Sequence, residues 1–295
     1  MKMKRRVALI TNRNKPKASE ALGKVRSLIE EHGHLVTQLH TGEENGVPEP
    51  GDVDLVIALG GDGTILAAAH KCLTLRVPLL GVNTGKVGFM AGYELDRFKA
   101  QAPDLLTDGE LNIQQFVPLH GVVRDTQGKP VFSSFALNEF VVSAGPPFRM
   151  ITLDISVDEQ VGPRVSGDGI IVSTPLGSTA YNVSAGGPIV APDVNAMTVT
   201  PIAAHSLSFR PIVIPNQSEV AIRVCSANSI ENSGTTLIID GQVDHRLRDG
   251  DVLRVSAAKE RIGFVHDPSV SYWNTLLNKM HWASEPNARG IKRRF

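Results

Sequence analysis

The stretch from Asp54 to Thr64 decides the fold, and it reads Asp-Leu-Val-Ile-Ala-Leu-Gly-Gly-Asp-Gly-Thr. Its first part, Asp54–Leu59, is an apolar run with the length of a strand that is buried in a parallel sheet. The run ends in glycines, and Ile65–Leu73 then follows with a helical pattern. A buried strand, a glycine turn and a helix in this order predict an α/β domain, in which ligands bind where the parallel strands end.

The glycine turn carries the strongest chemical signal, because Gly60, Gly61 and Gly63 surround a carboxylate, Asp62. Glycines let the backbone approach a phosphate closely, and the following helix offers free N–H groups and the positive end of its dipole. A carboxylate there would repel phosphate unless it binds a metal or accepts a proton from an attacking hydroxyl. The turn matches neither the P-loop nor the dinucleotide fingerprint. The alternative is a tight turn in which Asp62 only caps the helix.

Strand and helix patterns alternate through the rest of the first third of the chain. The predicted strands are Val7–Thr11, Leu35–Leu39 and Pro78–Val82, and a predicted helix at Ala18–His32 ends at Gly33. This alternation predicts a doubly wound parallel sheet.

From about Phe116 the pattern changes to short alternating segments separated by Gly, Pro, Asn and Asp, which predict a β-rich, sandwich-like second domain. The predicted strands are Val117–Arg124, Phe135–Ser143, Thr152–Val157, Gly169–Ser173, Ile212–Ile214, Glu219–Cys225, Thr235–Asp240 and Val252–Ala257. A helical pattern returns at Tyr272–Trp282, near the end of the sequence. We expect its Leu276, Leu277 and Met280 to dock on the first domain. The expected domains are residues 1–115, completed by 272–295, and residues 116–271.

The composition excludes several classes of protein. A chain of 295 residues is long enough for two domains. Lys plus Arg is 30 and Asp plus Glu is 30, which argues against a general nucleic-acid binder. The two cysteines, Cys72 and Cys225, have no metal-like spacing and indicate a reducing compartment. We find neither a signal peptide nor an apolar run of about 18 residues, so we expect a cytoplasmic protein without a membrane partner.

Several further stretches complete a family pattern. They are Asn83-Thr84-Gly85-Lys86-Val87-Gly88-Phe89-Met90, Leu137-Asn138-Glu139, Gly167–Tyr181 with its continuation Ser184–Pro188, Asp240-Gly241-Gln242 and Tyr272–Leu276. The glycine turn itself resembles the motif shared by NAD kinases, diacylglycerol and sphingosine kinases and 6-phosphofructokinases. In their order along the chain, from about Val7 to about Trp282, the stretches together resemble the NAD kinase family, in its bacterial ATP/polyphosphate type.

The resemblance implies an enzyme that transfers a phosphoryl group from ATP or another donor to the 2'-hydroxyl of the adenosine ribose of NAD. Asp62 would be the general base, and Gly60, Gly61, Gly63 and Thr64 would bound the phosphate path. A divalent metal, Mg²⁺ or Mn²⁺, is expected with ATP. The resemblance also implies a homo-oligomer, a dimer or tetramer, in which Tyr181 and Ala203 reach a neighbouring subunit's site.

The resemblance further implies a set of NAD-binding residues. They are Asp62, Gly63, Phe89, Asn138, Glu139, Arg149, Ser166, Asp168, Ser178, Thr179, Ala180, Tyr181, Ser184, Ala203 and Gln242. In this set an Asn can read the adenine edge, a carboxylate can accept from ribose hydroxyls, and a tyrosine can stack on a ring. The chain departs from the family at Met90, at Ser166, where a basic residue is usual, and at Leu176, where Thr is commoner. Donor preference and the choice between NAD and NADH therefore stay open.

Two other functions remain to be separated from this one. A lipid or sugar kinase of the same superfamily is disfavoured by the Ser173–Ser184 block and by Asn138-Glu139, and we find no basic amphipathic helix for a lipid surface. A non-enzymatic NAD sensor is disfavoured because Asp62 is retained.

Overall fold

The computed structural model describes residues 3–43, 45–85, 88–90, 92–206, 208–231 and 233–280. Lys86 and Val87 of one quoted stretch, and the end of the predicted C-terminal helix at Trp282, lie outside the described residues. Contacts along the backbone divide the chain into two compact units, Met1–Gln115 with Ile262–Phe295, and Phe116–Arg261.

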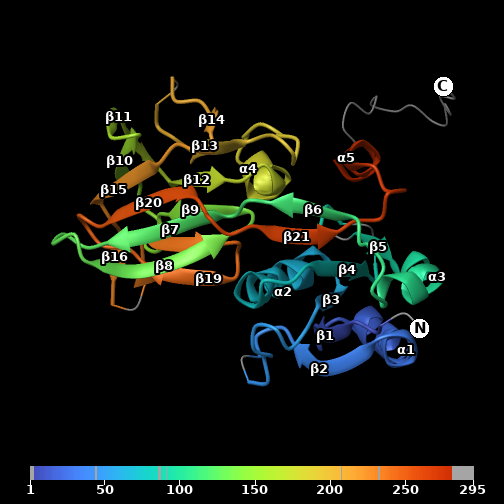
Figure 1. Cartoon of the computed structure of the whole chain (residues 1–295). Helices are drawn as coiled ribbons and strands as arrows, with labels where there is room; N and C mark the ends of the chain where they lie inside the picture. Colours follow the sequence, from blue (N-terminus) through green and yellow to red (C-terminus); the bar gives the residue numbers. More distant parts are fainter. Residues whose placement is uncertain are drawn as a thin grey trace, which may run out of the picture. The chain divides into compact units, whose positions relative to one another are not determined.

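The first unit is built on a seven-stranded sheet in the order β2-β1-β3-β4-β21-β6, with β5 paired to β4 (Figure 1). Its strands are β1 (Arg6–Thr11), β2 (His34–His40), β3 (Leu55–Gly60), β4 (Leu79–Asn83), β5 (Tyr93–Glu94), β6 (Ile113–Phe116) and β21 (Ile262–Val265). Its helices are α1 (Pro16–His32), α2 (Asp62–Leu75), α3 (Leu95–Leu105) and α5 (Tyr272–Met280). The pairs β1–β2, β1–β3, β3–β4 and β4–β21 are parallel, which confirms the predicted α/β fold with a parallel sheet.

The central strand β3 is buried along its whole length, as its apolar sequence predicts. Leu55 and Ile57 belong to a core that includes Val25 of α1 and Phe98 of α3. Val56 alternates to the opposite face of the pleated sheet and is also fully buried. Burial on both faces is the physical reason for the unbroken apolar run.

The boundary between the units differs from our expectation. We assigned residues 262–271 to the β-rich domain, but Ile262–Val265 forms β21 and pairs in parallel with β4. In Figure 1 the orange β21 lies beside the teal β4. A four-residue apolar segment reads the same in a parallel or an antiparallel sheet, so its sequence did not show which sheet it joins.

The C-terminal helix returns to the first unit, as predicted, but its apolar face is narrower than we expected. Leu276 is buried in α5, whereas Leu277 keeps 45% of its surface exposed. The sequence reading also missed α3, which contains Pro103 in its last turn. Proline is rare inside helices because it lacks an N–H group and crowds the preceding turn.

The second unit contains two six-stranded antiparallel sheets. One sheet has the order β11 (Gln160–Gly167), β10 (Ile151–Val157), β15 (Val220–Ser226), β20 (Val252–Ala257), β7 (Leu119–Arg124) and β8 (Pro130–Ala136). The other has the order β14 (Ile212–Pro215), β13 (Ala196–Ile202), β12 (Gly169–Ser173), β9 (Glu139–Ser143), β18 (Thr236–Ile239) and β19 (Val243–Arg246). The remaining elements are β16 (Ser229–Ile230), β17 (Ser233–Gly234), a 3-10 turn η1 (Leu176–Thr179) and the short helix α4 (Tyr181–Ser184).

A single apolar core joins the two sheets of this unit. It contains Leu153 and Val255 from one sheet and Phe140, Val172 and Leu237 from the other. Side chains of two sheets that meet in one core make a β-sandwich, so the predicted sandwich-like domain is confirmed.

One predicted strand of the sandwich is wrong in a way that matters for the site. We expected Phe135–Ser143 to be continuous, but the chain leaves one sheet after Ala136 and enters the other at Glu139. The sequence did not reveal this break, because no Gly or Pro separates Ala136 from Glu139. Asn138 therefore lies at a corner between two sheets instead of inside one continuous strand.

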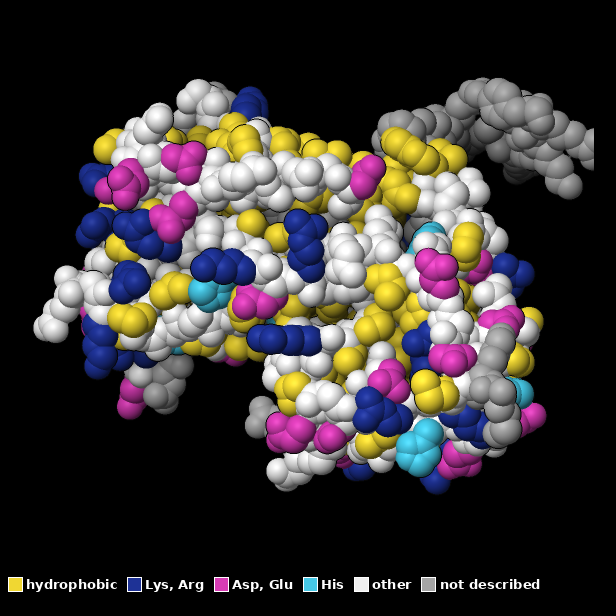
Figure 2. All heavy atoms as spheres, in the orientation of Figure 1, with side chains coloured by type: hydrophobic (Ala, Val, Ile, Leu, Met, Phe, Trp, Pro, Cys, Tyr) yellow, Lys and Arg dark blue, Asp and Glu magenta, His cyan; other side chains and the backbone are white. Residues whose placement is uncertain are grey.

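Charges of both signs are mixed over the face that Figure 2 draws, in agreement with 30 basic and 30 acidic residues in the chain. Among the described residues, no helix is long and apolar enough to span a membrane.

Candidate active site

Asp62 is placed where strand β3 passes into helix α2. Gly60 ends the strand, Gly61 is the residue before the helix, and Asp62 is its first residue. The Gly61 carbonyl accepts the N–H groups of Thr64 at 2.9 Å and Ile65 at 3.1 Å, which closes the first turn. A side chain at Gly60 would overlap Thr64, so this close approach requires glycine. The loop thus places Asp62 at the N-terminus of a helix, at the carboxyl end of a central parallel strand.

The Asp62 carboxylate is held from the neighbouring loop. It accepts the backbone N–H of Phe89 at 3.1 Å and that of Met90 at 3.3 Å. The N-cap residue of α2 is Gly61 and Asp62 is the first residue of the helix, so Asp62 is not its cap. The Asp62 side chain keeps 37% of its surface exposed. An oriented carboxylate that solvent can reach is suited to accept a proton from a hydroxyl group.

Helix α5 brings a cation and an aromatic ring to the same carboxylate. Lys279 Nζ lies 3.8 Å from Asp62 Oδ2, and 5.7 Å from the centre of the Phe89 ring. The Phe89 ring is also 6.4 Å from the ring of Tyr272. The sequence reading did not single out Lys279, because nothing in a sequence shows that residues so far apart meet.

In the β-sandwich unit, the corner at Asn138 is held by the carboxylate of Asp240. Asp240 follows β18 with a left-handed backbone, φ 54°, and is 6% exposed. Its two oxygens accept the N–H groups of Leu137 at 2.9 Å, Asn138 at 2.8 Å and Glu139 at 3.0 Å. Leu137 and Asn138 lie between the two sheets and Glu139 is the first residue of β9, so Asp240 supplies acceptors for N–H groups at the change of sheet.

Glu139 is a buried acid beside this corner. The residue is 5% exposed, and its Oε2 atom has no hydrogen-bond partner in the described structure. Burial, and to a smaller extent the charge of Asp240, raise the pKa of Glu139 to about 8. A hydrogen bond from the Tyr181 backbone opposes both effects.

The segment after β12 packs directly against the corner. Thr174 donates its hydroxyl to the Leu137 carbonyl at 2.5 Å and accepts the Gly177 N–H at 2.9 Å. A side chain at Gly177 would overlap the backbone of Asn138. Tyr181 begins the short helix α4 with its ring 45% exposed. Figure 1 shows α4 at the end of β12, in the sandwich unit.

The buried polar side chains of Asn182 and Ser178 hold this segment in place through hydrogen bonds to its backbone. Asn182 is fully buried and donates to the carbonyls of Ser178 at 3.1 Å and Pro188 at 3.0 Å. The Ser178 hydroxyl is also fully buried, donates to the Pro175 carbonyl at 2.7 Å and accepts the Val190 N–H at 3.0 Å. The Ser178 hydroxyl is thus hydrogen-bonded to the segment's own backbone, and its expected contact with NAD stays a prediction.

The structure separates the expected NAD-binding residues of the sandwich into two groups at opposite ends of one sheet. At the end where Glu139 pairs with Ser173 lie Asn138, Glu139, Thr179, Ala180, Tyr181, Ser184 and Gln242. At the end where Gly169 pairs with Ile202 lie Arg149, Ser166, Asp168 and Ala203. Strand β12 separates the ends, and at about 3.3 Å per residue its length is roughly 13 Å.

A side chain from one end cannot easily reach a ligand at the other. The structure therefore brings the first group together and leaves the second group apart from it within one chain. Arg149, Asp168 and Ala203 are exposed. Ser166 is half-buried, and its hydroxyl lies 3.2 Å from that of Thr152.

The fold and site define a class of protein, an α/β unit with a carboxylate in its glycine loop, joined in one chain to a β-sandwich with a polar corner. Residues 27–111 match the ATP-NAD kinase N-terminal domain, and residues 137–267 match the ATP-NAD kinase C-terminal domain. The chain is 35% identical over 285 residues to the NAD kinase of Syntrophobacter fumaroxidans, covering 94% of this chain and 99% of that one. It is 36% identical over 283 residues to the NAD kinase of Symbiobacterium thermophilum, covering 92% and 98%.

Two solved structures share the fold. Yeast NADH kinase complexed with NADH superposes with a TM-score of 0.83 at 22% identity, over 98% of this chain and 90% of that one. The NAD kinase from Archaeoglobus fulgidus in complex with ATP superposes with a TM-score of 0.70 at 23% identity, over 94% and 98%. This chain belongs to the NAD kinase family.

Proposed function

We propose that this protein phosphorylates the 2'-hydroxyl of the adenosine ribose of NAD to give NADP, with ATP or another phosphoryl donor such as polyphosphate. The observation that carries this proposal is the Asp62 carboxylate, which the Phe89 and Met90 N–H groups hold at the N-terminus of α2. The curated relatives, which are NAD kinases, support it.

The chemistry follows from this placement. Asp62 accepts the proton of the ribose hydroxyl, and the hydroxyl oxygen attacks the terminal phosphorus of the donor. The bond from that phosphorus to its bridging oxygen breaks, and ADP leaves with the electron pair when ATP is the donor. Because phosphoryl transfer depends mainly on position and charge, the N-terminus of α2 and Lys279 are suited to stabilise phosphate charge beside Asp62.

We further propose that a divalent cation, Mg²⁺ or Mn²⁺, accompanies the donor. Among the described residues, no three His, Cys, Asp or Glu side chains cluster in a way that could hold a metal ion. Mg²⁺ needs no such cluster, because it usually keeps several water ligands and binds through substrate phosphates with one or two carboxylates. The donor phosphates would hold it, and it would neutralise phosphate charge during transfer.

The sandwich unit would bind NAD through the corner at Asn138 and Glu139, with Tyr181 exposed for stacking. The group at the other end of the sheet, with Asp168 and Ala203, is roughly 13 Å away along β12. We propose that it serves the site of a second copy in a dimer or tetramer, whose mass sedimentation would measure. We also place the protein in the cytoplasm, in accord with its two free cysteines.

The test is a coupled assay with purified protein, NAD, ATP and Mg²⁺, in which a dehydrogenase specific for NADP detects the product. We expect NADP formation that requires all three reactants. Asp62→Asn should lose most turnover yet keep NAD binding and thermal stability, because the change is nearly isosteric. Asp96→Asn is the matched control, since Asp96 is 91% exposed on α3 and pairs with Lys99.

Normal turnover in Asp62→Asn would refute the role of Asp62. NAD binding without NADP from ATP or polyphosphate would favour an NAD sensor on this fold instead. Polyphosphate in place of ATP tests the donor, and NADH in place of NAD tests the acceptor.

A further inference from the structure

The corner at Asn138 contains two acids, Asp240 and Glu139, which differ in the hydrogen bonds that their carboxyl oxygens accept. Both oxygens of Asp240 accept backbone N–H groups, at 2.8 to 3.0 Å, and this is the pattern of an ionised carboxylate. Glu139, by contrast, has a buried Oε2 atom with no partner. Two carboxylates that share a buried site do not both ionise readily, so the unsatisfied one holds a proton.

The surroundings of Glu139 leave Asp240 as the charge that acts on it. In the described part of the chain, β12 lies against Glu139 through Ser173, the turn after β18 through Asp240, and α4 through the Tyr181 backbone. Among the described residues, Asp240 is the titratable side chain whose charge affects Glu139. Burial and this charge together raise the pKa of Glu139 to about 8, so the free protein carries a neutral Glu139 at pH 7.

A ribose presents two neighbouring hydroxyl groups, and each can donate a hydrogen bond. An ionised carboxylate can accept both, whereas a neutral acid gives up one acceptor position to its own proton. Acids that bind ribose hydroxyls in other dinucleotide sites use this arrangement. A ribose at this corner would therefore bind the ionised form of Glu139 more tightly.

We propose that Asp240 is a positioning residue that holds the Asn138–Glu139 corner and keeps Glu139 as a neutral acid until NAD binds and displaces its proton to the solvent. The proposal rests on the proposed function, because it takes the NAD ribose as the ligand of Glu139. When NAD binds, the O–H bond of Glu139 breaks, the proton passes to buffer, and the carboxylate accepts hydrogen bonds from the ribose.

The experiment is calorimetric titration of the full-length protein with NAD, without phosphoryl donor, in buffers of different ionisation enthalpy. A group of pKa about 8 is about 90% protonated at pH 7, so we expect release of up to about 0.9 proton per NAD. The affinity should rise up to about tenfold per pH unit between pH 6 and 7, and level off above pH 8.

Two variants separate the parts of the proposal. Glu139→Gln cannot ionise, so its proton release should vanish and its affinity should not change with pH. Asp240→Asn removes the neighbouring charge, so Glu139 should release less proton at pH 7 and the affinity should level off at lower pH. A role of Asp240 in folding alone would lower affinity without moving this pH profile.

The outcomes are distinct. NAD binding in the wild-type protein without proton release would overturn the proposal while leaving the proposed function intact. If folded Asp240→Asn keeps the wild-type dependence of NAD affinity on pH, the proposed role of Asp240 would be overturned. Absence of NAD binding, together with no NADP in the coupled assay, would overturn the proposed function and this proposal with it. If Asp240→Asn does not fold, the comparison of wild type with Glu139→Gln still decides whether Glu139 loses a proton.

Discussion

At the scale of single residues, Gly88 shows how closely the Asp62 carboxylate is confined. A side chain at this glycine would overlap the carboxyl group of Asp62. We expect Gly88→Ala to displace the carboxylate and to lower kcat about 100-fold, because misplacement of a catalytic group by about 1 Å has effects of this size. The coupled assay measures kcat, and NAD titration checks that binding persists.

The matched control for this variant is Gly23→Ala in α1, where an added side chain meets no atom within 4 Å. It should keep full activity and gain about 0.5–1 kcal/mol of stability, because alanine is the better helix former. Full activity in Gly88→Ala would mean that the position of the Asp62 carboxylate is not important for turnover.

The chemical type of several site residues could be read from the sequence, but their use could not. The glycine turn placed Asp62 before a helix, and the helix does begin there. For Ser178 the sequence shows a hydroxyl but not its partners, which are backbone groups of its own segment. Asp240 was quoted in a family block, yet its three donors come from residues about a hundred positions earlier in the chain.

At the scale of elements, α4 has only four residues and depends on its surroundings, since helices this short are unstable alone. Its buried Asn182 accepts the hydroxyls of Thr198 at 3.1 Å and Thr200 at 2.6 Å, besides donating to two carbonyls. We expect Asn182→Ala to cost roughly 2–4 kcal/mol and to raise KM for NAD, because Tyr181 and its N–H to Glu139 would shift. Urea unfolding and steady-state kinetics measure the two effects.

A smaller change tests the same element. Thr200→Val removes one of the Asn182 partners and should cost about 1 kcal/mol with little effect on KM. If Asn182→Ala leaves both stability and KM unchanged, α4 does not depend on this side chain.

Regular elements were predicted well where burial imposes a clear pattern, as in β3 and α1. Prediction failed at the split between β8 and β9, since no Gly or Pro marks the change of sheet between Ala136 and Glu139. It also failed for β21, since the pairing partner of a short strand depends on distant chain.

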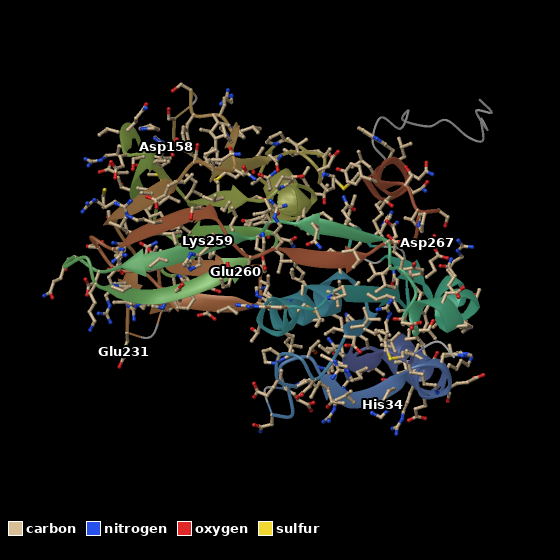
Figure 3. All side chains as sticks on the ribbon, in the orientation of Figure 1. His34, Asp158, Glu231, Lys259, Glu260 and Asp267 are labelled. Atoms are coloured by element: carbon tan, nitrogen blue, oxygen red, sulfur yellow. The ribbon has the colours of Figure 1, made fainter. Side chains whose placement is uncertain are left out.

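At the scale of the whole molecule, the C-terminal return of the chain is fixed by Asp267, which lies beyond the end of β21 (Figure 3). Its side chain is 1% exposed and accepts Arg97 of α3 at 3.0 Å and the Ser269 N–H at 2.9 Å. Burial alone would raise the pKa of Asp267, but the hydrogen bonds from Arg97 and Ser269 outweigh it and lower the pKa below 3.8.

A folded pKa below the unfolded value means that the carboxylate adds stability above about pH 4 and loses it as the pH falls through the folded pKa. Asp267→Asn should therefore cost on the order of 2–3 kcal/mol at pH 7 and progressively less below pH 4. Unfolding of both proteins by urea from pH 3 to 7 measures this, with the exposed Asp96→Asn as control. A difference that stays constant over this range would exclude the ionised carboxylate as its source.

By itself, the sequence determined the class of each unit and the glycine turn that places Asp62 at the start of a helix. Both follow from local physics: apolar periods indicate burial, and a glycine turn after a buried strand indicates that a helix begins. Only the tertiary structure decided that Lys279 reaches Asp62, that Asp240 holds the corner of Glu139, and that β21 completes the parallel sheet. These contacts join residues far apart along the chain, and such pairing leaves no local pattern, because hydrogen bonds and ion pairs depend on position in space.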